Sequence, residues 1–233
     1  RKPFRGSAMS GRKNVKRGHW QILLAAALFL LALGLTLYPV VSNWYIGRHQ
    51  SRIQTEYREV LEQTDSAEIE SIRESAVAYN KTITPGAAEE AYSQASIRLA
   101  AEDYVNQLNV SGSGIMGYVE IPKIGVDLPI YHGTGADSLD RGTGHLLGSS
   151  LPVGGESTHT IITGHSGMAS QKMFTDLEQL REGDIFYLHV LDETLTYEVR
   201  EIHTVLPHDT TYLGIEPGED LCTLVTCTPT GVN

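Results

Sequence analysis

The order of apolar and polar residues divides the chain into an apolar stretch, a helical segment and a strand-rich body. Residues 22–41 carry no charge and are rich in Leu and Ala. About twenty apolar residues are enough for a helix to span a bilayer. Trp20 lies at one edge of this stretch, and Trp44 and Tyr45 lie at the other, where interfacial aromatic residues gather. The pattern predicts a transmembrane helix over 21–43. Its length favours a retained anchor over a cleaved signal peptide, whose apolar core is shorter.

Apolar residues recur at helical spacing among charged ones between residues 51 and 80, a stretch without Gly or Pro. They are Ile53, Tyr57, Val60, Leu61, Ile69, Ile72, Ala76 and Tyr79. The pattern predicts a helix that is broken near Thr64–Ser66 and lays one face on the body. A solvated stalk fits its first half equally well. A second helical pattern covers Ala87 to Leu108, and a Gly/Ser-rich joint follows at 110–114.

From Ile115 onward the pattern becomes that of strands. A period-2 alternation predicts a half-buried strand, and its members are Ile124, Val126, Leu128 and Ile130. Similar alternation on both sides of Asp192–Glu193 predicts a hairpin. One short helix is predicted over 170–181, with Ser170 as its cap. About seven short strands with little helix predict a mainly β fold, a closed or nearly closed barrel.

Charge is distributed unevenly along the chain. The first eighteen residues hold seven basic side chains and no acidic one, whereas from residue 51 onward ten basic residues face twenty-eight acidic ones. The acidic body repels phosphate, so the sequence argues against nucleic-acid binding. Positive charge before the apolar stretch predicts a cytoplasmic N-terminus, an extracellular body and therefore residence in the cell membrane.

Candidate chemistry lies where two predicted strands end. The predicted strand 223–226 is followed by Cys227 and then by a Pro and a Gly. The predicted strand 158–163 leads to His165. A thiol and an imidazole that meet in the fold form a thiolate–imidazolium pair, the activated form of a cysteine nucleophile. For Cys227 alone, burial as a small hydrophobe is the commoner state of a lone cysteine. Cys222 lies an odd number of positions away on the same predicted strand, so a disulfide is not expected, and we assign Cys222 to the core.

Three stretches together resemble a sortase, namely 117–125, 158–167 and 223–231. The segments 130–134 and 144–155 are similar to those of class C, the pilin-polymerising sortases of Gram-positive bacteria. The resemblance covers 114–233 and implies a sortase-type β-barrel.

The chain is thus expected to comprise five parts. These are a basic cytoplasmic tail (1–20), a transmembrane helix (21–43), an extracellular helical segment (44–81), a lid and linker (82–113) and a catalytic barrel (114–233). Class C lids carry an Asp-Pro-aromatic triplet that is absent here, and Tyr92 and Tyr104, the aromatic residues of the segment, are expected to pack.

The resemblance implies a transpeptidase. Cys227 would attack the Thr carbonyl of an LPxTG-like sorting signal, and His165 would act as general acid and then base. Weaker assignments are substrate contacts by Thr228 and by Ser166, which stands where class C commonly has Arg, and a supporting role for His145. Sortases also use an Arg on the strand after the cysteine strand. The chain ends at Asn233, before that position, so no residue is assigned this role.

No cofactor and no metal are expected, because the histidines and acids lack metal-binding spacing. The expected partners are pilins or surface proteins with LPxTG-like signals and the membrane, which class C relatives often cross a second time near the C-terminus. The implied function is transfer of the cleaved signal to a pilin lysine. Two alternatives stay open: attachment of surface proteins to cell-wall peptide, and a non-catalytic membrane-tethered pilus assembly protein.

Overall fold

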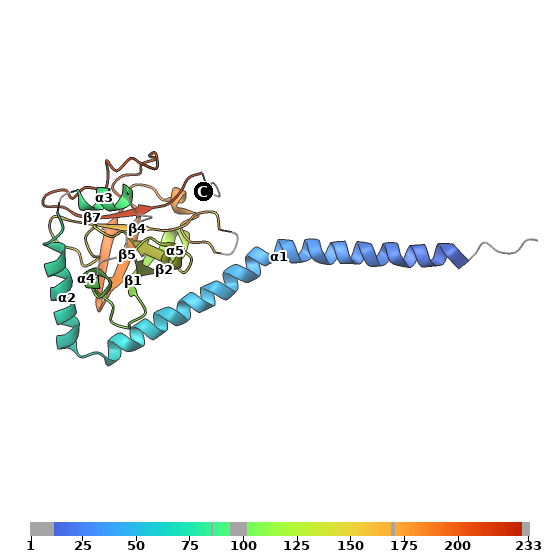
Figure 1. The fold of residues 1–233 in the computed structure, drawn as a ribbon, viewed down its shortest axis with the longest axis horizontal. Coiled ribbons are helices and arrows are strands. Elements are labelled where there is room, and N and C mark those ends of the chain that lie inside the picture. Colours follow the sequence, from blue (N-terminus) through green and yellow to red (C-terminus); the bar gives the residue numbers. More distant parts are fainter. Residues whose placement is uncertain (1–11, 85, 94–101, 169–170, 230–233) are drawn as a thin grey trace, which may run out of the picture.

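The structure is a computed structural model, and it describes residues 12–84, 86–93, 102–168 and 171–229. A long N-terminal helix, α1, leads to a compact body of strands and short helices (Figure 1). Helix α1 (Arg12–Gln63) is continuous over 52 residues. Its stretch Trp20–Tyr38 is long and apolar enough to cross a membrane, by length and composition, and none of it is buried in the protein. The helix bends near its middle (Figure 1).

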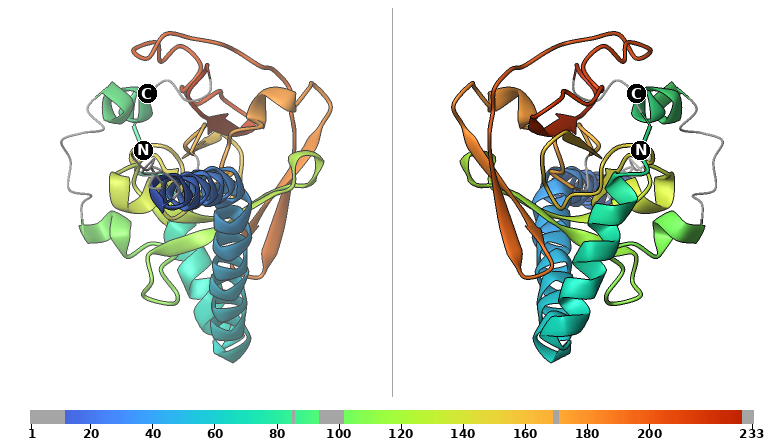
Figure 2. Two further views of the ribbon diagram at one scale, coloured as in Figure 1. Left: turned by 90° about the vertical axis from the view of Figure 1, so that its right-hand side faces the viewer. Right: turned by 90° about the vertical axis from the view of Figure 1, so that its left-hand side faces the viewer.

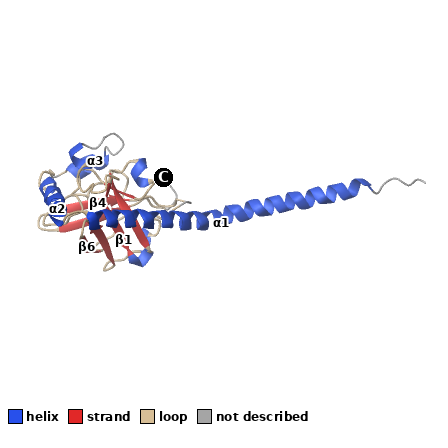
Figure 3. Cartoon of the chain, turned by 90° about the horizontal axis from the view of Figure 1, so that it is seen from below, coloured by secondary structure: helices blue, strands red, loops and turns tan. Residues whose placement is uncertain are grey.

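The second half of α1 packs against the barrel (Figure 3). Tyr57 is buried there, and its hydroxyl donates to the Met116 carbonyl and accepts from the Leu191 N–H, both at 3.2 Å. Ile53 and Leu61 pack beside it. This part of the predicted helix is therefore docked on the body and is not a solvated stalk.

The predicted break in the helix is confirmed. Helix α1 ends at Gln63 and α2 (Ser66–Asn80) begins after Asp65, whose carboxylate accepts the Ala67 N–H at 2.8 Å. Such an N-cap satisfies a backbone donor that has no partner within the helix.

Helix α2 is held to the body at its middle and at its C-terminal end. Arg73 forms ion pairs with Asp192 and Glu193 at a hairpin turn of the barrel. The Asn80 amide exchanges two hydrogen bonds with the backbone of Leu151, at 2.7 and 3.1 Å. The two helices thus brace one side of the barrel.

Seven strands form one nearly closed sheet. They are β1 (Ile115–Ile121), β2 (Val126–His132), β3 (Thr143–His145), β4 (Thr158–Thr163), β5 (Ile185–Val190), β6 (Glu193–Glu198) and β7 (Asp220–Val225). Their order is β6-β5-β1-β2-β3-β4-β7, and the pairs β2–β3 and β4–β7 are parallel. The expected barrel is confirmed, and so is the hairpin between β5 and β6.

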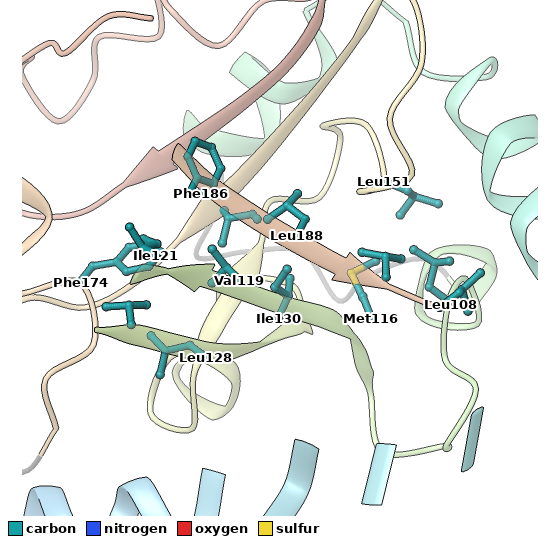
Figure 4. Close-up of a cluster of buried hydrophobic side chains, with 14 of the residues drawn as sticks. Leu108, Met116, Val119, Ile121, Leu128, Ile130, Leu151, Phe174, Phe186 and Leu188 are labelled. Carbon is teal, nitrogen blue, oxygen red and sulfur yellow. The ribbon is translucent and has the colours of Figure 1, made fainter. Parts of the chain in front are cut away.

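The core fills the interior of this barrel (Figure 4). Val119 from β1 and Leu188 from β5 lie at its centre, and Phe174 comes from the loop after β4. In β5, Phe186, Leu188 and Val190 are buried while their neighbours are more exposed, as the alternation predicts.

Two predicted elements are wrong. Ile124 does not belong to the strand with Val126, because it ends a 3-10 helix, η1 (Pro122–Ile124), which closes on Gly125 in the left-handed conformation. In place of a helix over 170–181, the structure has only the 3-10 turn η2 (Leu177–Gln179) within the residues it describes there, and Ser170 lies outside them. Met173 has a φ of 42°, which is incompatible with a right-handed helix.

The residues that the structure describes also include three short α-helices. They are α3 (Ala87–Ser93), α4 (Glu102–Val105) and α5 (Ala136–Leu139). Residues 94–101 and the side chain of Tyr92 lie outside the described residues. Tyr104 on α4 is fully buried, in agreement with the packing role predicted for it.

Candidate active site

The site forms where two parallel strands leave the sheet side by side. Strands β4 and β7 pair from Thr158↔Asp220 to Thr163↔Val225, and the Gly164 N–H then donates to the Val225 carbonyl at 3.0 Å. The same register carried two residues further sets His165 opposite Cys227. The fold therefore brings the two residues predicted from separate stretches of sequence to one rim of the barrel.

Cys227 lies just after the end of β7, and its thiol is free and exposed. Cys222 lies within β7, where it packs against the core. Burial raises the pKa of the Cys222 thiol, because the thiolate would lose its hydration. Cys222 is therefore inert packing, as predicted, and Cys227 is the thiol that a reagent or substrate can reach.

His165 is held by the loop that follows it. Its carbonyl accepts the Phe174 N–H at 3.0 Å. Gly164 before it lies so close to the Phe174 ring that a Cβ there would come within 2.7 Å of a ring carbon. Phe174 is fully buried, so the backbone of His165 rests on the core while its side chain stays partly open.

Asp140 is a neighbour of His165 that the sequence did not reveal. Its carboxylate lies 3.9 Å from Nε2 of the imidazole and is largely exposed. At this distance the carboxylate attracts the imidazolium form electrostatically. Asp140 follows α5 in an ordinary turn, and nothing in its local sequence marks it, since only tertiary packing places that turn beside β4.

The two residues assigned weakly to substrate contact both engage the protein's own groups. Ser166 is buried, and its hydroxyl donates to the Cys227 carbonyl at 2.6 Å. Thr228 is exposed, and its hydroxyl donates to the carboxylate of Glu178 on η2. The hydroxyl of Thr226, the residue before Cys227, donates to the Gly164 carbonyl at 2.8 Å.

His145 lies in β3 and is fully buried. Its Nε2 faces the Ser150 carbonyl at 2.8 Å and therefore carries the proton, so Nδ1 accepts from the Tyr104 hydroxyl at 2.9 Å. Burial lowers the pKa of His145 to about 4, which keeps the ring neutral. These contacts tie α4 to the barrel. Among the described residues, no group of three or more His, Cys, Asp or Glu is arranged to hold a metal ion.

The comparisons with known proteins agree with this geometry. The sortase domain family matches residues 119–233. Sortase C of Streptococcus pneumoniae has 43% sequence identity and a TM-score of 0.70, over 76% of this chain and 89% of that one. A pilus-related sortase C of group B Streptococcus has 37% identity and a TM-score of 0.70, over 77% and 91%. Sortase A of Streptococcus agalactiae is 25% identical over 88% of this chain and 77% of its own.

A nearly closed β-barrel with a cysteine and a histidine at the ends of adjacent parallel strands defines a cysteine transpeptidase of the sortase type. The chain belongs to the sortase family. The two solved neighbours compared above are sortase C enzymes, and one of them is pilus-related.

Proposed function

We propose that the protein cleaves an LPxTG-like sorting signal between Thr and Gly and transfers the acyl group to a lysine amine of a pilin. Cys227 is the nucleophile and His165 the general acid and base. The observation that carries this proposal is the shared register of β4 and β7, which sets an accessible thiol opposite a partly open imidazole.

The reaction proceeds in two halves. The Cys227 thiolate attacks the Thr carbonyl carbon, a C–S bond forms, and the bond to the Gly nitrogen breaks as the His165 imidazolium donates a proton to the leaving amine. The lysine amine then attacks the thioester and gives its proton to His165. An amide bond forms, the C–S bond breaks and the thiolate returns. The Asp140 carboxylate, 3.9 Å from Nε2 of His165, attracts the ring whenever it carries the second proton.

The first test is mass spectrometry of the full-length protein in detergent after incubation with an LPxTG peptide. We expect a mass gain equal to the acyl fragment on the peptide that contains Cys227, and no gain in Cys227→Ala. An adduct that persists in Cys227→Ala would refute the assignment of the nucleophile.

The acceptor is a separate question. Supplying a pilin with its lysine, or a cell-wall peptide with its amine, to the preformed thioester separates the pilin function from surface-protein anchoring. Faster release of the acyl group by the pilin lysine is the expected result, since the solved neighbours include a pilus-related sortase. Preference for the cell-wall peptide would assign the protein to anchoring instead.

We further propose that α1 anchors the protein in the cell membrane with the N-terminus in the cytoplasm. The proposal rests on the exposed apolar stretch Trp20–Tyr38 and on the basic residues before it. Protease added to intact cells is expected to cleave the barrel and to spare an N-terminal tag. Cleavage of the tag would indicate the opposite orientation.

The 82–113 segment is proposed to act as a lid. Ala88 on α3 is buried against Leu146, Ile161 and Leu213, in a cluster that also includes Val225, two residues before Cys227. Ala88→Asp should release α3 and raise the rate of adduct formation. Ala87→Asp, on the half-exposed neighbour, is the matched control. An unchanged rate in Ala88→Asp would exclude a restraining role for α3.

A further inference from the structure

Ser166 lies next to His165 in sequence, yet its side chain turns toward the cysteine strand. It is buried, with 3% of its surface exposed, and its hydroxyl donates to the Cys227 carbonyl at 2.6 Å. A residue in this position could have offered its side chain to a substrate. Instead, the hydroxyl is hydrogen-bonded to the backbone of the nucleophile itself.

The bond falls where the ladder between β4 and β7 would continue. In a parallel ladder every second residue of a strand bonds to the two residues that flank its partner. After the bond from the Gly164 N–H to the Val225 carbonyl, the next in this direction would join the Ser166 N–H to the Cys227 carbonyl. The Ser166 hydroxyl makes that contact from its side chain. It thus holds the two strand ends together after the regular strands have ended at Thr163 and Val225.

Holding this carbonyl also orients the group that follows it. The peptide unit is planar, and in a trans unit the C=O and the next N–H point in opposite directions. With the Cys227 carbonyl held toward β4, the Thr228 N–H points away from β4. The Thr228 hydroxyl is occupied with Glu178, so the backbone N–H is the group of Thr228 that can donate to a developing oxyanion.

We infer that Ser166 is a positioning residue for the acyl-transfer reaction: its hydroxyl fixes the Cys227–Thr228 peptide plane and so directs both the thiol and the Thr228 N–H. This inference rests on the proposed role of Cys227 as nucleophile. It replaces the expectation that Ser166 contacts the substrate. The chain offers a matched comparison, because Thr226 joins the same strand ends without touching the Cys227 carbonyl.

The test compares Ser166→Ala, Ser166→Thr and Thr226→Val in the full-length protein. For each variant we would measure the melting temperature, and the rate and KM of adduct formation with an LPxTG peptide. In Ser166→Ala the maximal rate should fall about tenfold or more while KM changes little, because misplacement of reacting groups costs rate rather than binding. Ser166→Thr retains the hydroxyl and should recover most of the rate. Thr226→Val should lower the melting temperature with a rate within about twofold of the parent.

Three outcomes would overturn the inference. They are a parental rate in Ser166→Ala, an equal loss of rate in Ser166→Ala and Thr226→Val, and a Ser166→Thr variant no faster than Ser166→Ala. A rise in KM alone would return Ser166 to substrate binding. Failure of the proposed function looks different, because the parent would then form no adduct, or Cys227→Ala would still form it. The two failures are therefore distinguishable in one series of spectra.

Discussion

A cysteine and a histidine packed inside the fold can be compared with a cysteine and a histidine at the rim of the barrel, because the two pairs lie in opposite physical environments. Cys222 is partly buried against the core and His145 is fully buried, and burial raises the pKa of the thiol and lowers that of the imidazole. Cys227 and His165 lie past the ends of β7 and β4, where one thiol is exposed and one imidazole is partly open. Cysteine and histidine are thus uncharged packing residues in one place and accessible, potentially reactive groups in the other. Burial, rather than residue type, makes the difference.

The largest expected effect separates the two thiols. Cys227→Ala should lower adduct formation by at least about a thousandfold, because no other group replaces the nucleophile. Cys222→Ala should keep the rate within a few-fold and cost roughly 1 kcal/mol of stability through lost packing. Single-turnover kinetics and urea unfolding measure the two quantities. Loss of activity in Cys222→Ala without loss of stability would contradict the assignment of Cys222 as a packing residue.

The two histidines should separate in the same way. His165→Gln is expected to slow adduct formation by about a hundredfold or more, the usual contribution of general acid–base catalysis, with little change in melting temperature. His145→Gln disturbs a fully buried pair of hydrogen bonds and should cost roughly 2–3 kcal/mol of stability. Its kcat, measured below its melting temperature, should stay near that of the parent. A stable but inactive His145→Gln variant would contradict this assignment.

Stability should depend on pH through the interior histidine. The pKa of His145 is about 4 in the folded protein and near 6.5 when unfolded, so between these values the unfolded chain binds more protons. This contribution is fully present above pH 6.5, is lost as pH falls to about 4, and amounts to roughly 3 kcal/mol. Burial also lowers the pKa of His159, which acts in the same direction.

Urea unfolding between pH 4 and 7.5 measures this slope. The His145→Gln variant should show a shallower slope than the parent. A parental slope in His145→Gln would mean that other groups carry the pH dependence.

The smallest expected effect concerns the attachment of α1. Tyr57→Phe removes the hydroxyl that bridges Met116 and Leu191, leaves the ring in place, and should cost about 1–2 kcal/mol. Adduct formation should be unaffected, because Tyr57 contacts β1, β2 and the turn after β5 and not the ends of β4 and β7. A fall in rate would show that the docking of α1 affects the active site. The buried residues and the rim would then not act independently.

The comparison also explains which predictions succeeded. The break at Thr64–Ser66 and the β5–β6 hairpin arise from local patterns, and the local sequence therefore reveals them. The helix over 170–181 failed, because Met173 and Phe174 are apolar for a different reason: they are drawn into the core as a loop, and Met173 adopts a left-handed backbone. Apolar spacing does not distinguish these two causes.

The sequence by itself determined the strand-rich body, the apolar N-terminal stretch, and Cys227 and His165 as residues at the ends of strands. Those features depend on neighbours a few positions away. Only the tertiary structure decided that β4 and β7 pair in a register that sets His165 opposite Cys227, that Asp140 lies beside the imidazole, and that Ser166 turns to the Cys227 carbonyl. These contacts join segments far apart along the chain. Their geometry is set by how the whole barrel packs, and no local pattern encodes it.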